Sequence, residues 1–213
     1  KLADEIRVFL IDSISQTDGH LSSNLGTVEL IIALHKVFDS QKDVFIYDVG
    51  HQAYTHKILT GRADQFSTLR QTHGLSGYIN YQESPHDHWE SGHAGTALSA
   101  LHGALIAKKM KGEEGTGIAV IGDASITNGM AFEALNLIGN DHSLKGLIIL
   151  NDNESRTLHM PINAYCGLLD RRSHRRANHE MHTAFFYRPD SYQRTRCGDS
   201  NGTRARPIQN TRC

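Results

Sequence analysis

Two short, continuously apolar segments separated by one helical pattern place the narrowest limits on how this chain folds. Residues 117–121 (GIAVI) and 146–150 (GLIIL) have the pattern of buried strands, and apolar residues at helical spacing predict an amphipathic helix over 128–138 between them. Strands that are apolar at every position are buried on both faces, as in parallel sheets covered by helices. The sequence therefore predicts an α/β fold with a doubly wound, mostly parallel sheet and helices on both faces.

Apolar spacing also predicts the elements that precede this unit. Residues 43–47 (DVFIY) form a short apolar run suited to a buried strand. Apolar residues at helical spacing over 2–10 and 28–35 predict two helices, and residues 96–111, rich in Ala and Leu with lysines at the end, predict a third. The order of these elements is that of a sheet whose strands are connected by helices.

The formal net charge of −1 conceals an abrupt change of composition near residue 155. Residues 1–155 carry 11 Lys and Arg against 19 Asp and Glu, a net charge of −8, whereas residues 156–213 carry 11 Arg, no Lys and four acids, a net charge of +7. The second stretch has five Ile and Leu and no Val, which is too little apolar surface to offset the entropy of ordering its backbone. We therefore predict a folded domain over 1–154 and an irregular or disordered, Arg-rich tail over 155–213 that is not part of the fold.

Composition argues against several classes of protein. A net charge near zero is not that of a nucleic-acid-binding protein with a uniformly basic surface, although the Arg-rich tail leaves an RNA-binding arm as an alternative. The mean hydropathy of −0.42, without an apolar run near the roughly 20 residues of a bilayer span, argues against a membrane protein. We predict a cytoplasmic protein with no nucleic-acid or membrane partner. The cysteines lack metal-ligand spacing and an even count, so neither zinc nor a disulfide framework is predicted.

Polar side chains follow the two predicted strands at the points where they end. Gly122-Asp123-Ala124-Ser125 follows the first, and Asn151-Asp152-Asn153-Glu154 follows the second. If the strands are neighbours, Asp123 and Asn153 converge from adjacent loops and offer a carboxylate and an amide oxygen to one Mg²⁺ ion, whose remaining ligands would be phosphate oxygens and water. The alternative is that these residues only cap the helices that follow.

Three histidines stand directly after glycines in predicted turns: His20, His51 and His93. Glycine permits a tight turn that exposes the neighbouring imidazole. Histidine titrates near neutral pH, so it can donate to a phosphate or exchange a proton with a hydroxyl group. An exposed histidine in a single loop has no special meaning, but three in glycine turns of one domain indicate candidate proton-transfer or phosphate-binding groups.

Five segments carry recognisable motifs in order along the chain. They are 18–38 (DGHLSSNLGTVELIIALHKVF), 47–62 (YDVGHQAYTHKILTGR), 91–105 (SGHAGTALSALHGAL), 122–136 (GDASITNGMAFEALN) and 147–154 (LIILNDNE). A lone Gly-Asp-Gly would not be specific, but five motifs in sequence are. Over about residues 3–154 they resemble the amino-terminal domain of the 1-deoxy-D-xylulose-5-phosphate synthases, thiamine-diphosphate enzymes related to transketolase.

The resemblance implies a transferase that condenses pyruvate, after decarboxylation, with glyceraldehyde 3-phosphate to give 1-deoxy-D-xylulose 5-phosphate, a precursor for isoprenoids and thiamine. It further implies thiamine diphosphate and Mg²⁺ as cofactors and a homodimer as the assembly of the intact protein. The location it implies is the cytoplasm in a bacterium or the plastid in a plant.

The resemblance also assigns roles to residues at matching positions. Asp123, Asn153 and the main-chain carbonyl of Ser155 would hold the Mg²⁺ ion. His51 would contact the cofactor near its reactive carbon, and His20 would face the substrate and assist proton transfer. The residues expected to bind the cofactor diphosphate are Gly92, His93, Ala94, Ala124, Ser125 and Asn153.

Two departures from the family pattern stand out. Its Gly-Asp-Gly is Gly-Asp-Ala here, which keeps the carboxylate of Asp123 and is tolerable if Ala124 avoids a positive φ. After Glu154 the family continues with Met-Ser-Ile-Ser, whereas this chain has Ser-Arg-Thr-Leu, and we expect nothing from there to Cys213 to resemble the family. Our hypothesis is that the tail is read from a shifted frame or is otherwise non-native, which the nucleotide sequence across codon 154 would test.

In the family, the glutamate that protonates the aminopyrimidine of the cofactor comes from the next domain, together with the pyrimidine pocket. We therefore expect this chain alone to be inactive or nearly so. Two alternatives stay open: the corresponding half of a transketolase-like enzyme acting on ketose phosphates, and a non-catalytic fragment that only binds the cofactor or pairs with an intact subunit.

Overall fold

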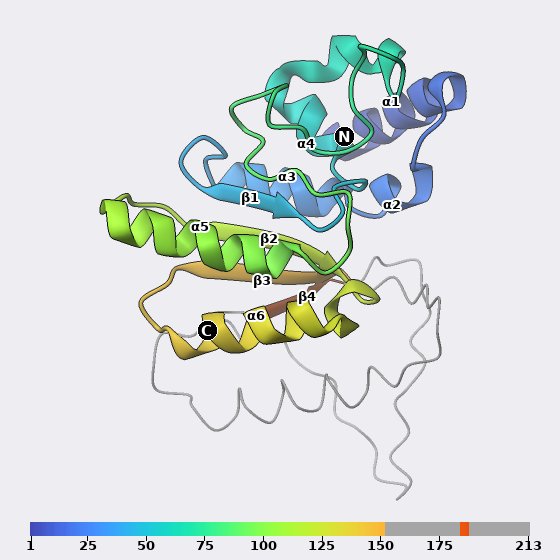
Figure 1. Ribbon diagram of the computed structural model, residues 1–213. Helices are drawn as coiled ribbons and strands as arrows, with labels where there is room; N and C mark the ends of the chain where they lie inside the picture. The colour runs from blue at the N-terminus through green and yellow to red at the C-terminus, as the bar shows by residue number, and fades with distance from the viewer. Residues whose placement is uncertain (152–183, 188–213) are drawn as a thin grey trace, which may run out of the picture.

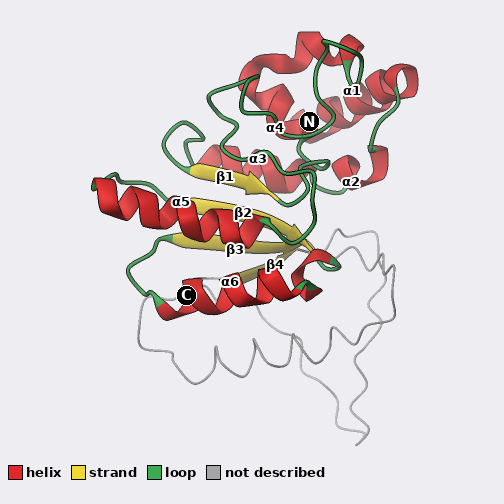
Figure 2. Cartoon of the chain, viewed as in Figure 1, coloured by secondary structure: helices red, strands yellow, loops and turns green. Residues whose placement is uncertain are grey.

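A parallel sheet forms the centre of the computed structural model, which describes residues 1–151 and 184–187. Within these residues the strands are β1 (Val44–Tyr47), β2 (Gly117–Gly122), β3 (Gly146–Asn151) and β4 (Ala184–Tyr187), and they lie in the order β1-β2-β3-β4. Every pairing is parallel, so the strand arrows point to one side of the sheet (Figure 2). The predicted strands over 43–47, 117–121 and 146–150 are confirmed.

Helices cover both faces of this sheet, as predicted (Figure 1). Helices α5 (Ala97–Lys111) and α6 (Gly129–Asn140) pack with Ile46, Ala119 and neighbouring residues on one face. Helix α3 (Val28–Val37) packs with Phe45, Ile118 and neighbouring residues on the other. The two sets alternate along β1 and β2 because successive side chains of a strand point to opposite faces. Both faces are therefore buried, which explains why these strands are apolar throughout.

A further layer lies beyond α3 and consists of short helices around one long one. Helix α1 (Leu2–Thr17) buries Ile6, Leu10 and Ile14 against Phe66 and Leu75. This apolar cluster is separate from the two that cover the sheet. The short elements are α2 (Leu21–Leu25), α4 (Tyr54–Lys57), η1 (Ile58–Arg62) and η2 (Ala63–Thr68), and η3 (Ser125–Thr127) lies apart from them between β2 and α6.

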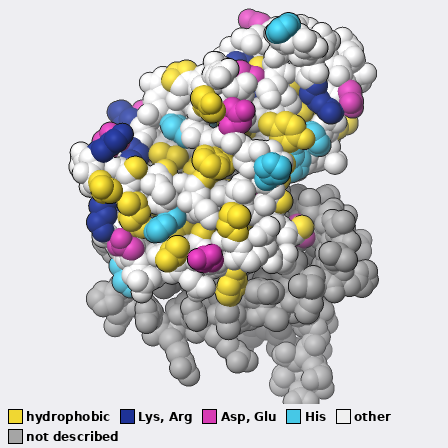
Figure 3. Space-filling model, viewed as in Figure 1, with side chains coloured by type: hydrophobic (Ala, Val, Ile, Leu, Met, Phe, Trp, Pro, Cys, Tyr) yellow, Lys and Arg dark blue, Asp and Glu magenta, His cyan; other side chains and the backbone are white. Residues whose placement is uncertain are grey.

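The ends of α5 and α6 follow local rules of helix termination. Helix α5 ends at Gly112, whose φ of 66° is left-handed, and its last turn carries the lysines visible as a basic group in Figure 3. Helix α6 begins after Asn128, whose side-chain oxygen accepts a hydrogen bond from Met130 N at 3.0 Å. Among the described helices, none has the length and apolar content that crossing a bilayer requires.

Part of the predicted tail joins the sheet. The backbone of Ala184–Tyr187 pairs with Ile148–Asn151 of β3, which corrects for these four residues the expectation that 155–213 stays outside the fold. The exposed edge of β3 offers unpaired N–H and C=O groups, and an extended segment satisfies them whatever the composition around it. The other residues of the predicted tail lie outside the described part of the chain, as do Asn153 and Ser155.

Buried ion pairs fasten the irregular segment 69–95 to α4 and η1. Arg62 donates to both carboxylate oxygens of Asp87, and Lys57 Nζ lies 2.6 Å from Glu83 Oε2. The side chains of Lys57 and Asp87 are completely buried and that of Arg62 is 4 % exposed. Carboxylates and cations at this depth are stable only because they satisfy one another.

Removing one carboxylate should therefore destabilise the fold. In Asp87→Ala, the buried guanidinium of Arg62 loses two of its hydrogen bonds to carboxylates and keeps the one with Glu83 at 3.3 Å, and His56 loses its acceptor. We expect the free energy of unfolding to fall by about 3–5 kcal/mol. Denaturant unfolding followed by circular dichroism measures this loss. Lys42→Gln is the control, since it removes only an exposed pair with Asp39 and should change little. An Asp87→Ala protein as stable as the control would show that the network is not needed.

The same carboxylate ends a chain of two imidazoles, the buried His56 and the half-buried His35. His56 Nε2 donates to Asp87 Oδ1 at 3.0 Å, which leaves His56 Nδ1 to accept from His35 Nε2 at 2.8 Å. Burial, together with the neighbouring His56, lowers the pKa of His35 from 6.5 to about 4, and burial also lowers the pKa of His56. Burial by itself raises the pKa of Asp87, but hydrogen bonds from His56 and Arg62 outweigh it and hold that pKa well below its usual range.

Acid should destabilise the protein through this chain of side chains. Between pH 6.5 and about 4 the unfolded chain binds more protons at His35 than the folded chain does, so stability falls as pH falls through that window. We expect the thermal unfolding temperature to decrease across the window, and His35→Gln, which still donates to His56, to decrease less. An unfolding temperature that is independent of pH in this range would contradict the assignment.

Candidate functional site

The carboxyl ends of β1, β2 and β3 meet at one edge of the sheet and carry polar residues. Asp48 follows β1, Asp123 follows β2, and Asn151 ends β3 opposite Gly122. Asp48 is 2 % exposed and Asp123 is 4 % exposed. Asn151 Oδ1 is buried and has no hydrogen-bond partner within the described residues. A buried carboxylate beside a buried amide oxygen on the neighbouring strand is a donor set that suits a hard cation.

The predicted metal ligands are only partly within the described chain. Asp123 lies where predicted, at the buried end of β2. Asn153 and Ser155 lie outside the described residues, so their part in the site stays a prediction. Among the described residues, His, Cys, Asp and Glu do not gather in a group of three that could hold an ion. A cation here would need amide and carbonyl oxygens as well as Asp123.

Ala124 occupies the position where the family has glycine. Its φ of −70° and ψ of −35° are ordinary right-handed helical values. The condition under which the extra methyl is tolerable, a negative φ, is therefore met. Ala124 is exposed and Ser125, half-buried, begins η3, so both face the same edge of the sheet as the end of β2.

A glycine turn lies against the end of β1. Gly92 and Gly95 have φ values of 69° and 83°, which side chains rarely adopt. Gly92 N donates to Val49 O at 3.2 Å, and Gly95 N donates to the carboxylate of Asp48 at 3.0 Å. Residues 92–94, which include His93 and Ala94, are exposed at the top of this turn. The absence of a side chain at Gly92, the small side chain of Ala94 and the exposed positions of all three residues suit the close approach of an anion.

Two of the three predicted histidines lie side by side. The ring centroids of His20 and His51 are 5.1 Å apart in an edge-to-face arrangement, and Tyr78 lies 5.8 Å from His20. The Nδ1 atoms of both imidazoles are buried and have no hydrogen-bond partner within the described residues. His93, by contrast, is exposed on the turn. The structure thus assembles an imidazole pair from two turns that are far apart in the sequence.

Asn24 holds these two turns together, a role that local sequence patterns do not reveal. Its side-chain nitrogen donates to His20 O at 2.6 Å and to His51 O at 2.8 Å, and its oxygen accepts from Tyr54 N at 2.8 Å. Asn24 is completely buried. Its only sequence signal is a polar residue on the buried side of α2, next to the first glycine turn.

Burial makes both imidazoles neutral near pH 7. Burial, followed by the nearby charge of Arg70, lowers the pKa of His20. Burial, followed by the charge of His20, lowers the pKa of His51, and the carboxylate of Asp48 opposes this by raising it. A neutral imidazole can accept a proton at one nitrogen and donate one at the other, which suits both groups to proton transfer.

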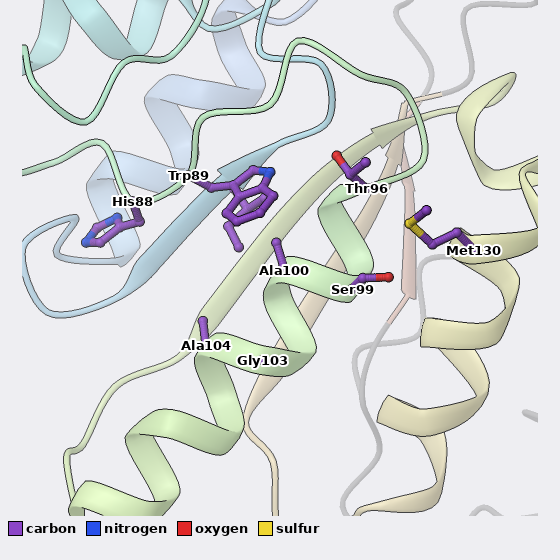
Figure 4. A pocket seen from close by; sticks show the side chains of 9 residues that line it. His88, Trp89, Thr96, Ser99, Ala100, Gly103, Ala104 and Met130 are labelled. Carbon is purple, nitrogen blue, oxygen red and sulfur yellow. The ribbon is translucent and has the colours of Figure 1, made fainter.

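A separate apolar hollow of about 600 Å³ lies along α5. Figure 4 shows small residues of the helix, Ala100, Gly103 and Ala104, below Trp89. Met130 lines the end nearest the start of α6. This hollow has none of the buried carboxylates or paired imidazoles that lie at the carboxyl edge of the sheet, so that edge is the candidate site.

Comparison with known proteins agrees with this geometry. A family model described as 1-deoxy-D-xylulose-5-phosphate synthase matches residues 1–194. The 1-deoxy-D-xylulose-5-phosphate synthase of Paraburkholderia phymatum is 54% identical over 170 residues, which are 80% of this chain and 26% of that protein. The synthase of Halalkalibacterium halodurans is 59% identical over 155 residues, 72% of this chain and 24% of that protein. The chain thus spans about a quarter of the length of these curated relatives.

Solved structures show the same fold at low sequence identity. Transketolase from Leishmania mexicana superposes with a TM-score of 0.65 at 18% identity and covers 87% of this chain and 35% of that one. Transketolase from Campylobacter jejuni gives a TM-score of 0.66 at 17% identity, covering 78% and 31%. These likenesses confirm the predicted α/β fold.

The family model extends beyond the end of the resemblance that the motifs predicted. It continues to residue 194, whereas the sequence motifs had placed the end of the resemblance at Glu154. Short motifs lose the resemblance where residues diverge, but a match over a whole domain can continue through such a stretch. The synthase of Halalkalibacterium halodurans matches over 155 residues, which agrees with a resemblance that weakens near residue 154. The hypothesis of a shifted frame stays a prediction.

The electrostatic interaction between His20 and His51 can be tested directly. Because the charge of His20 lowers the pKa of His51, His20→Asn should raise the pKa of His51, though burial still holds it below the ordinary value. Titration of the histidine ring resonances by NMR measures the change. His102→Asn on α5 is the control and should leave His51 unaffected. A pKa of His51 that is the same in both variants would show that the two rings do not interact.

Proposed function

The chain belongs to the 1-deoxy-D-xylulose-5-phosphate synthase family, and we propose that its described residues form the diphosphate-binding half of a thiamine-diphosphate site. The full-length protein would condense pyruvate with glyceraldehyde 3-phosphate with loss of CO₂. The observation that carries this proposal is the single sheet edge at which buried Asp123, the glycine turn and the His20–His51 pair lie together.

The residues at this edge suit the cofactor they are proposed to hold. Asp123 and Asn153, with the main-chain carbonyl of Ser155, would hold Mg²⁺, and Asn151, whose Oδ1 is buried, ends the strand that neighbours β2. Residues 92–94 and Ala124–Ser125 would line the diphosphate, where small side chains leave the backbone accessible. When bound, thiamine diphosphate supplies the electron sink for decarboxylation and for carbon–carbon bond formation.

The imidazoles would transfer protons and orient the cofactor and the substrate. His51 lies in the buried turn after β1, where it would contact the cofactor. His20 lies next to it and next to Tyr78, where it would face the substrate. Burial lowers the pKa of both, so each neutral ring can accept a proton at one nitrogen and donate one at the other.

The synthase is favoured over a transketolase-like activity. The synthases are 54–59% identical to this chain, whereas the transketolase structures are 17–18% identical and support the fold alone. Product analysis of a full-length protein that contains this domain would discriminate between the two. A homodimer and a cytoplasmic location are part of the same proposal and rest on the family. A non-catalytic fragment would bind the cofactor without turnover.

Calorimetry with thiamine diphosphate and Mg²⁺ tests the proposed site on this chain. Asp123→Ala removes the buried carboxylate, and we expect the affinity to fall by about tenfold or more, the effect of losing a charged contact. Glu133→Gln, which changes an exposed residue of α6, is the control and should bind like the wild type. Equal affinity of Asp123→Ala and wild type would remove the metal site, and absence of binding by the wild type would contradict the proposed cofactor role.

A further inference from the structure

The turn after β1 has a backbone conformation that its own sequence does not favour. Val49 has a φ of 64°, and Gly50 N donates to Asp48 O at 2.7 Å, which closes a three-residue turn around Val49. Such a turn with a positive φ is rare, and a β-branched residue at its centre is strained. Strain of this kind persists only where surrounding contacts hold it, and it is found most often at functional sites.

The contacts that hold this turn come from the glycine turn of residues 92–95 and the start of α5. Gly95 N lies 3.0 Å from each carboxylate oxygen of Asp48, and Ala97 N donates to Asp48 Oδ1 at 3.1 Å. Gly92 N donates to Val49 O at 3.2 Å. Asp48 is 2 % exposed, so these donors replace water around its charge. Since both of its carboxylate oxygens accept from backbone N–H groups, Asp48 acts as an anchor between the turn after β1 and residues 95–97.

This anchor lies between the two parts of the proposed site. His51 is three residues beyond Asp48 in the same turn, and its ring packs against His20. On the other side, a Cβ atom at Gly95 would lie 2.7 Å from side-chain atoms of Asn128, at the start of α6. The turn is therefore confined between Asp48 and Asn128. The carboxylate of Asp48 thus joins the turn that carries His51 to Gly95, and Gly95 lies against Asn128 in the segment that follows Asp123.

We propose that Asp48 is a positioning residue that fixes the turn of residues 92–95 against the turn that carries His51, so that the diphosphate of a bound cofactor and the imidazole are held in one geometry. This inference rests on the proposed function for the identity of the ligand. Its structural part, the connection between the two turns, does not depend on that identity. The charge of Asp48 also acts on His51, since the carboxylate raises the pKa of that imidazole.

Strand β1 provides a matched control at its other end. Asp43 precedes β1 and also accepts backbone hydrogen bonds, from Thr116 N at 2.6 Å and from Asp39 N at 2.9 Å. Asp43→Asn and Asp48→Asn therefore make the same chemical change at opposite edges of the sheet. Asn keeps the shape of Asp and one accepting oxygen, so the variants remove the charge and leave the packing in place.

The test compares three forms of the 213-residue chain, the wild type, Asp48→Asn and Asp43→Asn, with Mg²⁺ and pyrophosphate as one probe and Mg²⁺ and thiamine diphosphate as another. We expect Asp48→Asn to bind both probes about tenfold more weakly, the difference between a charged and a neutral hydrogen bond. We also expect a lower pKa of His51 by NMR, because the carboxylate that raises it is gone. Asp43→Asn should bind like the wild type and leave the pKa of His51 unchanged.

Each result separates the inference from the proposed function. Wild-type affinity together with an unchanged pKa of His51 in Asp48→Asn would overturn the positioning role. If the wild type binds neither probe, the proposed function fails, and the pKa of His51 in Asp48→Asn still decides the inference. If Asp48→Asn does not fold, hydrogen exchange of the wild type decides: slow exchange at the Gly95 and Ala97 amides supports the connection, and exchange at the rate of an open loop overturns it.

Discussion

Parallel pairing of β1, β2 and β3 is the constraint on which the rest of the structure depends. Parallel strands need long crossover connections, which bring the chain back to the same edge of the sheet before each strand begins. The carboxyl ends of the strands therefore lie together at the opposite edge. Asp48, Asp123 and Asn151 are brought to one edge in this way. The crossover between β1 and β2 is the longest, and it supplies both the buried ion network and the glycine turn of the candidate site.

That crossover contains the irregular segment 69–95. Buried carboxylates there accept hydrogen bonds from backbone N–H groups that a helix or a sheet would otherwise pair. Glu83 Oε1 accepts from Ser76 N at 2.7 Å, and Asp87 Oδ2 accepts from Asn80 N at 3.4 Å. The same two carboxylates pair with Lys57 and Arg62. The segment is therefore ordered by charged side chains from α4 and η1, and this order extends to Tyr78, which packs against His20.

Local patterns predicted the elements well because each depends on its own residues. The strand expected over 117–121 is Gly117–Gly122, and the helix expected over 96–111 is Ala97–Lys111. The polar residues after strands and glycines identified Asp123, His20 and His51. Sequence reasoning missed Asn24 and the anchoring role of Asp48, because their hydrogen bonds join residues 27 and 47 positions apart. It also missed β4: residues 184–187 (AFFY) are a short apolar run, but the stretch around them is rich in Arg and poor in Ile, Leu and Val.

The two sides of the candidate site are consequently positioned by different physical means. Asp123 follows a regular strand, so the register of β2 with its neighbours places it. His51 and the turn at Gly95 lie on backbone with positive φ values nearby, which has no stability of its own and depends on side chains from elsewhere in the chain. Asp48 joins the turn after β1 to the turn at Gly95, and Asn24 joins the turns that carry His20 and His51. It follows that Asp123 is positioned wherever the sheet forms, whereas His51 and the turn at Gly95 require the complete tertiary arrangement around β1.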